Sequence, residues 1–201
     1  MVRYCPLRAV FDQVLNAGYI AEVSLGRTAK GTAFLEPSIL ALLVEAILRV
    51  ILGWRMLVSG LSNVRRWPNP VNTASILFPR GSVFFGFTAT VLMVAGGFGT
   101  TAGIQTQISA LMIILFLLPT FALHWYWLKV LPAMAPVVKN AIKDENAQVY
   151  FRTFDRQSYH AHEVGLRDNL VFLAAAVYFA VRGSAGFGVD NWFSAWVIRL
   201  F

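Results

Sequence analysis

Apolar positions along the chain fall in long continuous runs rather than in the alternating pattern of a β-strand. From Gly81 to Leu128 the sequence contains no Asp, Glu, Lys or Arg. That length accommodates two helices of about 20 residues, each sufficient to cross a hydrocarbon core of ~30 Å. A membrane β-barrel would instead show segments that alternate residue by residue. The pattern therefore predicts an all-α, polytopic membrane protein.

We predict four membrane-spanning helices that form a four-transmembrane-helix bundle. The first begins at the sequence Glu36-Pro37-Ser38 and ends before two prolines that stop a helix. The second and third are joined by a turn so short that they must run antiparallel. The fourth has an uncharged core of only 13 residues, so we extend it back to His162. The predicted spans are residues 38–61, 82–101, 108–128 and 162–182.

Segments of mixed polarity flank the membrane domain, which we place at residues 38–182. Residues 1–37 form an N-terminal tail in which we expect no signal peptide. Residues 183–201 are rich in aromatic side chains and are predicted to lie at the membrane interface. A polar segment of roughly 35 residues separates the third and fourth spans. The first and third loops carry eight Lys and Arg, against five in the two tails and the second loop, which favours a cytoplasmic position for the first and third loops but leaves the orientation open.

The composition agrees with a membrane protein. Hydrophobic residues make up 57% of the chain and charged residues 13%, against about 45–50% and about 25% in soluble domains. The net charge of +7 is expected to face anionic lipid headgroups rather than nucleic acid. The single cysteine, Cys5, can form no internal disulfide. We expect an integral protein of the bacterial inner (cytoplasmic) membrane, in contact with the lipid bilayer.

Three charges interrupt the first predicted span, in the stretch EAILRVILGWRMLVSG. Glu45 and Arg49 lie four residues apart, with the acid first, and are predicted to form an ion pair on one helix face. At 100° per residue, Gly53, Met56 and Gly60 lie on the same face. Because a charge at the centre of a bilayer costs about 2.5–3.5 kcal/mol, we expect this face to contact protein or a cavity rather than lipid.

The third charge, Arg55, lies off this face and needs a partner on another helix. It sits about 9 Å before the end of the first span, and Asp168 sits equally far into the fourth span, which enters from the same side. We therefore predict a contact between Arg55 and Asp168. The charges of the first span have two alternative interpretations. They are either structural ion pairs that fix the helix register, or the polar lining of a site for a quinone headgroup or an anionic substrate. The sequence leaves both interpretations open.

Small residues mark the faces at which these helices are expected to approach one another closely. The second span is rich in Gly, Ala and Thr, and in lipid such residues allow helix backbones to come into contact. We predict helix packing at Gly53, Gly60, Gly96 and Gly97.

Few residues offer chemistry inside the predicted membrane domain. His124 is the only histidine within a span and lies at the aqueous end of that span, which argues against a haem held by two histidines. His160, His162 and Glu163 have the side chains of a metal site, but histidines in a polar loop are more often solvated, so we predict no metal site. We expect no covalent cofactor, and a bound quinone or lipid stays open.

The order of small and charged residues resembles that of the DoxX/DoxD-like membrane proteins. The first span contains Arg49-x-x-x-Gly53 and then Gly60, and the second ends in a glycine pair. The third span ends in His124-Trp125, and the fourth opens with Asp168-Asn169-Leu170. The resemblance covers about residues 38–190 and implies a four-helix membrane bundle.

The resemblance implies two alternative functions. Some DoxD-like members are the small subunit of thiosulfate:quinone oxidoreductases. Where the family commonly has an acid before the glycine pair and a basic residue after the turn threonine, this chain has Met93 and Gln107. We therefore favour a non-catalytic accessory or structural subunit of a larger electron-transfer complex, respiratory or photosynthetic, or of another membrane complex. The alternative is the membrane subunit of a quinone-linked oxidoreductase, in which Arg49, Arg55 and His124 hold the quinone or a sulfur oxyanion.

Overall fold

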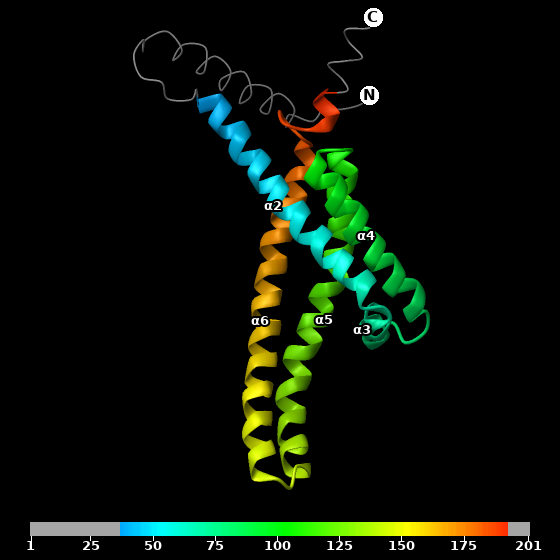
Figure 1. The fold of residues 1–201 in the computed structure, drawn as a ribbon, viewed down its shortest axis with the longest axis vertical. Coiled ribbons are helices and arrows are strands. Elements are labelled where there is room, and N and C mark those ends of the chain that lie inside the picture. Colours follow the sequence, from blue (N-terminus) through cyan, green and yellow to red (C-terminus); the bar gives the residue numbers. More distant parts are fainter. Residues whose placement is uncertain (1–36, 193–201) are drawn as a thin grey trace, which may run out of the picture. The chain divides into compact units, whose positions relative to one another are not determined.

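The computed structural model describes residues 37–192, and this part of the chain is helical without a strand (Figure 1). The all-α prediction is therefore confirmed. The predicted N-terminal tail and the last nine residues of the predicted interfacial tail lie outside the described residues. The helices belong to one compact unit that begins at Ser38. They are α2 (Pro37–Arg65), α3 (Asn69–Leu77), α4 (Ser82–Ala102), α5 (Thr106–Ala141) and α6 (Glu145–Arg182).

Three of these helices, α4, α5 and α6, are long and apolar enough to cross a membrane. With 29 residues α2 also has the necessary length, but its apolar sequence is interrupted by Glu45, Arg49 and Arg55. The chain is thus an integral membrane protein by the length and composition of its described helices, whereas the predicted count of four spans is not confirmed.

The helices pack around an apolar core to which α2, α5 and α6 contribute. Helices α5 and α6 run antiparallel and lie side by side, and α2 and α4 pack at the end where α5 begins (Figure 1). Leu52 of α2, Leu117 of α5 and Phe179 of α6 are each at most 2% exposed. Ala110, Ile113, Met56 and Ala176 complete this core cluster.

Helix α4 contributes small residues that allow close backbone contact. A Cβ atom placed at Gly97 would overlap the backbone of Leu57 in α2, and one placed at Gly53 would lie 2.5 Å from the amide nitrogen of Thr101. Gly60 meets the next turn of α4, where its Cβ would lie 2.9 Å from that of Met93. On its other side α4 meets α5, since a Cβ at Gly96 would lie 2.9 Å from the carbonyl oxygen of Ser109. The glycines thus set the distances from α4 to α2 and to α5.

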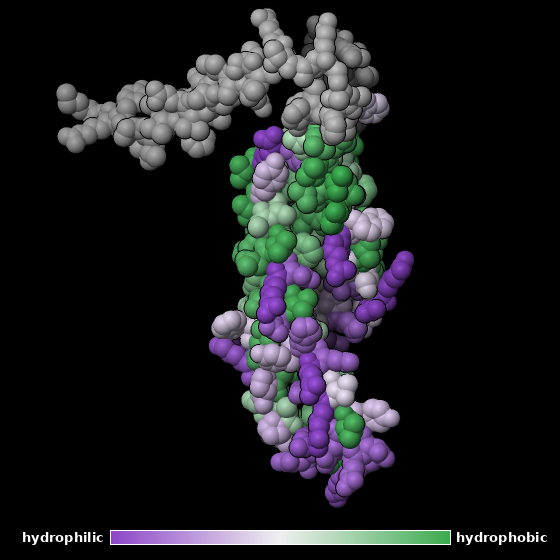
Figure 2. All heavy atoms as spheres, turned by 90° about the vertical axis from the view of Figure 1, so that its left-hand side faces the viewer, coloured by the Kyte–Doolittle hydropathy of each residue, from purple (hydrophilic) through white to green (hydrophobic). Residues whose placement is uncertain are grey.

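The polar segment predicted between the third and fourth spans is almost entirely helical. Helix α5 continues through Pro132 and Pro136 to Ala141, and α6 begins at Glu145, where the side chain of Asp144 accepts a hydrogen bond from the amide of Asn146 at 2.8 Å. With 36 and 38 residues, α5 and α6 are about 54 and 57 Å long, well beyond a ~30 Å hydrocarbon core. The two helices therefore extend past the bundle as a hairpin, whose surface is mostly hydrophilic near the turn (Figure 2).

The hairpin is held together by a seam with the spacing of a coiled coil. Half-buried residues recur at intervals of four and three along α5 and at the matching intervals along α6, the pattern that keeps one face of each helix against the other. Three of the α6 positions are polar, so this seam is less apolar than the bundle core. The seam includes Leu128, Leu131, Ala135 and Val138 of α5 and Phe151, Asp155, Ser158 and His162 of α6.

Replacement of Gly97 by Ala is expected to destabilise the bundle, because the added methyl group would overlap the backbone of α2. Overpacking of this kind costs about 1–3 kcal/mol. Thermal unfolding in mild detergent measures the effect. The control is Val91→Ile, which adds a similar volume on an exposed face of the same helix. Equal stability of the two variants would contradict the proposed glycine contact.

Candidate functional site

A cluster of charged side chains lies where α2, the α4–α5 turn and the end of α6 meet. We call Glu45, Arg49, Tyr178, Arg182 and Asp190 the polar cluster. Glu45 is only 8% exposed. Its carboxylate accepts hydrogen bonds from the Tyr178 hydroxyl at 3.2 Å, the Arg182 Nε at 3.1 Å and the amide of Ala185 at 3.1 Å. This carboxylate therefore ties α2 to the last turns of α6 and to the segment after it.

The second buried charge, Arg49, bonds to backbone carbonyl groups. It is 3% exposed, and its guanidinium donates to the carbonyl oxygen of Thr100 at 3.4 Å and to that of Phe187. It also packs against Gly103, where a Cβ atom would overlap the guanidinium. The missing side chain at Gly103, which has a φ of 70°, thus makes room for Arg49 in the α4–α5 turn.

Asp190 caps the N-terminus of α5 from a position far along the chain. Its carboxylate accepts hydrogen bonds from the amides of Gln105 at 2.9 Å and Thr106 at 3.2 Å. Its own amide donates to the carbonyl oxygen of Gly103 at 3.0 Å. The first amides of a helix lack partners within the helix and carry the positive end of its dipole, so a carboxylate placed there is stabilising. The segment after α6 is thereby fixed to the α4–α5 turn.

The structure pairs the predicted charged residues differently from our expectation. Among the ion pairs of residues 37–192, none joins Glu45 to Arg49, because the Glu45 carboxylate pairs with Arg182. None joins Arg55 to Asp168 either, and both side chains are exposed. At 100° per residue, Asp168 lies about 120° from the seam position of His162, so it points away from the neighbouring helix.

The three residues expected to hold a quinone do not converge on one place. Arg49 contacts the turn at Gly103, whereas His124 lies 18 residues after Thr106 on α5, a distance of about 27 Å along the helix. Arg55 is exposed on α2. A single headgroup cannot contact Arg49 and His124 together.

His124 instead faces His162 across the α5–α6 seam. The two Nδ1 atoms are 3.1 Å apart, and the Trp127 ring lies nearly parallel to that of His162, with centroids 5.6 Å apart. Gly165 leaves the space for the His124 ring, because a Cβ atom there would lie 2.6 Å from its Cε1. When both imidazoles are neutral, the Nδ1–H of one donates to the Nδ1 of the other, so these two atoms are each other's hydrogen-bond partners within the helix interface.

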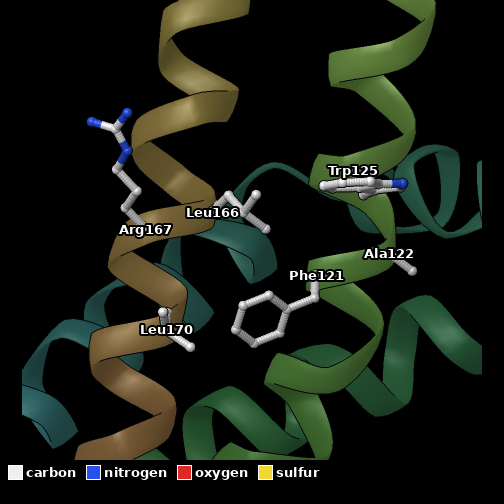
Figure 3. A pocket seen from close by; sticks show the side chains of 6 residues that line it. All are labelled: Phe121, Ala122, Trp125, Leu166, Arg167 and Leu170. Carbon is white, nitrogen blue, oxygen red and sulfur yellow. The ribbon is translucent and has the colours of Figure 1, made fainter.

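No group of three or more His, Cys, Asp or Glu side chains in the described part of the chain is arranged to hold a metal ion. Two apolar grooves lie on the helix surface instead. One, of about 530 Å³, runs between α5 and α6 beside Trp125, Leu166 and Leu170. Phe121 and Leu166 point into the space between the helices, while Arg167 points away from α5 (Figure 3). The other, of about 570 Å³, is lined by α4 and the end of α2.

Three members of the polar cluster were missed from the sequence, namely Tyr178, Arg182 and Asp190. Arg182 occupies the last turn of α6 and is followed by Gly183, a usual pattern at a helix end, so a structural role was not apparent. Asp190 stands in a segment without apolar periodicity. A carboxylate buried in a membrane span, such as that of Glu45, needs a cation as a partner. This need is the signal that could have pointed to Arg182, which lies at the end of the fourth predicted span.

The comparisons with known proteins agree with the resemblance found in the sequence. Residues 30–125 match the DoxX family model. This stretch contains α2, α3, α4 and the first part of α5, and with them Glu45, Arg49 and the packing glycines. The chain is therefore similar to the DoxX family over this stretch, which is just under half of its length. No curated protein and no solved structure matches the chain.

Replacement of Glu45 by Ala is expected to lower stability, because it leaves the Tyr178 hydroxyl, the Arg182 guanidinium and the Ala185 amide without their shared acceptor. Hydrogen bonds to a charged group are worth about 1.5–3 kcal/mol. Glu163→Ala is the matched control, since Glu163 pairs with Arg167 at the surface, where such pairs contribute about 0–1 kcal/mol. Chemical unfolding in detergent measures the free energy of unfolding of each variant. Equal free energies of unfolding for the two variants would contradict the role of Glu45.

Replacement of Asp190 by Ala should speed hydrogen exchange at the amides of Gln105 and Thr106, because these lose their acceptor. Loss of a helix cap of about 1 kcal/mol corresponds to roughly fivefold faster exchange. Asp144→Ala is the control, since Asp144 caps α6 and its loss should affect Asn146 instead. Unchanged exchange at residues 105 and 106 in the Asp190 variant would show that the cap is not formed.

Proposed function

We propose that the chain is an integral membrane subunit that supports a larger electron-transfer complex, respiratory or photosynthetic, of the bacterial inner membrane, and that it performs no chemistry of its own. The observation that carries this proposal is the use of the polar cluster. Each carboxylate and guanidinium in it binds another group of the same chain. These groups stabilise the bundle and are not directed at a substrate.

We further propose that α2 is a fourth membrane span. Apart from Arg65 at its end, α2 carries three charges, and two of them, Glu45 and Arg49, are buried against protein, so they would not face lipid. The exposed charge, Arg55, lies ten residues before the end of the helix at Arg65, about 15 Å by helical rise. A long arginine side chain covers part of such a distance by extending toward the headgroups.

The remaining surface of the spans supports contact with lipid or with other membrane subunits. Large apolar side chains are exposed on each helix that would lie in the bilayer, for example Trp54 of α2, Phe84 of α4 and Leu115 of α5, at 59–66%. The two apolar grooves offer further places for an acyl chain or for a helix of a neighbouring subunit.

The alternative of a quinone-linked oxidoreductase has less support. Its three expected ligands, Arg49, Arg55 and His124, lie apart, and His124 is engaged with His162. The groove beside Trp125 offers an apolar place for a quinone tail, but the one charged residue that lines it, Arg167, points away from α5 (Figure 3).

Purification from native membranes in mild detergent tests the two alternatives. We expect the chain to co-purify with a larger complex in fixed stoichiometry, without extractable quinone and without thiosulfate-dependent quinone reduction by the isolated chain. His124→Ala should leave electron transfer by the assembled complex unchanged. Quinone reduction by the isolated chain that is lost in His124→Ala would overturn the proposal in favour of the oxidoreductase.

A further inference from the structure

The groove between α4 and the end of α2 follows one face of α4. Its residues on that helix recur at intervals of three and four, so they share a face. The one hydroxyl in the lining, that of Thr90, donates to the carbonyl oxygen of Gly86 at 2.9 Å and so has a partner within the helix. The groove therefore offers a continuous apolar surface to a ligand. It is lined by Val64, Trp67, Phe87, Thr90, Val91, Val94, Ala95 and Phe98.

The groove has the length of one leaflet of a bilayer. It follows α4 from Phe87 to Phe98, an interval of 11 residues, which is about 16 Å by helical rise. Half of a ~30 Å hydrocarbon core is about 15 Å. Since α4 has 21 residues and is about 32 Å long, the groove covers about half of the helix. An acyl chain of one leaflet matches this length, whereas a neighbouring helix that crosses the bilayer would extend well beyond it.

Basic residues lie at the end of the groove that is nearer the start of α4. Arg65 and Arg66 directly precede the lining residue Trp67, and both are exposed. Arg80, also exposed, lies two residues before α4 begins at Ser82. Tryptophan is enriched at the membrane–water interface, and basic residues next to a span meet anionic headgroups there. The groove thus begins beside cations at the level of the headgroups and runs toward the middle of the bilayer.

No acid in this part of the chain balances these cations. Between Glu45 and Asp144 the sequence contains no Asp or Glu. Glu45 is itself buried, and Asp144 caps α6. Among residues 37–192, no ion pair includes Arg65 or Arg66. The connection from α2 to α4 therefore carries positive charges alone, which an anionic headgroup would complement.

We propose that the groove holds an acyl chain of an anionic phospholipid whose phosphate is bound by Arg65 and Arg66. The inference rests on the proposed placement of α2 as a membrane span and is independent of the partner complex. Arginine suits this role because its planar guanidinium can donate two parallel N–H bonds to a phosphate. Trp67 joins the two parts of the site, since an indole ring packs against a hydrocarbon chain while its N–H turns toward the polar headgroup.

Fluorescence of Trp67 tests the site, because bromine atoms on a lipid chain quench a tryptophan that they contact. The full chain is placed in phosphatidylcholine nanodiscs that contain increasing fractions of phosphatidylglycerol brominated on its acyl chains. The contribution of Trp67 is the difference between the unmodified chain and Trp67→Phe. We expect saturable quenching of this contribution at a low fraction of phosphatidylglycerol, and no saturable quenching by brominated phosphatidylcholine.

The double variant Arg65→Gln/Arg66→Gln should move half-saturation to a roughly 25-fold higher lipid fraction, since each basic residue at an anionic membrane surface strengthens binding roughly fivefold. The matched control, Arg152→Gln/Arg156→Gln, removes the same charge from exposed residues of α6 and should leave half-saturation unchanged. Ala95→Phe fills the groove without a change of charge and should abolish the saturable quenching.

The contrary outcomes are distinguishable. Trp54, which is 59% exposed near the middle of α2, reports through Trp54→Phe whether this helix lies in the bilayer. Quenching of Trp54 by brominated phosphatidylcholine without saturable quenching of Trp67 would refute the lipid site while the span stands. Quenching of neither tryptophan would refute both.

Recognition of the phosphate has its own test. Equal half-saturation in the unmodified chain and in Arg65→Gln/Arg66→Gln would overturn the proposal, because the two arginines would then contribute nothing to binding. Quenching of Trp67 that rises in proportion to the fraction of either lipid would also overturn it, by showing ordinary contact with the bilayer in place of a site.

Discussion

Two opposite charges buried in an apolar helix bundle, on Glu45 and Arg49, are the constraint on which the rest of the bundle depends. Removing such groups from water costs several kcal/mol each unless other groups replace the lost hydrogen bonds. Here the replacements come from the end of α4, the last turns of α6 and the segment that follows α6. The helix ends must therefore assemble around α2, and Asp190 joins the same assembly to the start of α5.

Close packing between α2 and α4 makes this arrangement possible. Lipid supplies little hydrophobic drive for helix association, so contact depends on how closely the backbones can approach. Gly53 and Gly60 of α2 lie on the same face as the buried charges, and Gly97 of α4 meets that face directly. The charges can be buried only because these positions lack side chains. Packing and electrostatics thus act through a single face of one helix.

The two ends of the molecule differ in how they use polar residues. At the end that contains the polar cluster, nearly every polar group binds another part of the same chain. Two buried hydroxyls among the described residues, those of Thr100 and Thr106, lack a partner. At the other end, Glu145 and Glu163 stand among the basic residues of α6, and Glu163 pairs with Arg167 and His160 at the surface. The carboxylate of Glu45 and the guanidinium of Arg49 are thus buried between helices, whereas the described ion pairs of the hairpin lie at its surface.

The sequence by itself determined the helical membrane character and the face of α2 that carries Glu45, Arg49 and the glycines, because hydrophobic length and a period of 3.6 residues are local properties. It also pointed to the DoxX family. It did not reveal that the polar segment after residue 128 continues two helices, since that segment is stabilised by a seam between partners distant in sequence. Only the tertiary structure decided that Glu45 pairs with Arg182 rather than Arg49, because periodicity specifies which residues share a face but not which helix comes to lie against it.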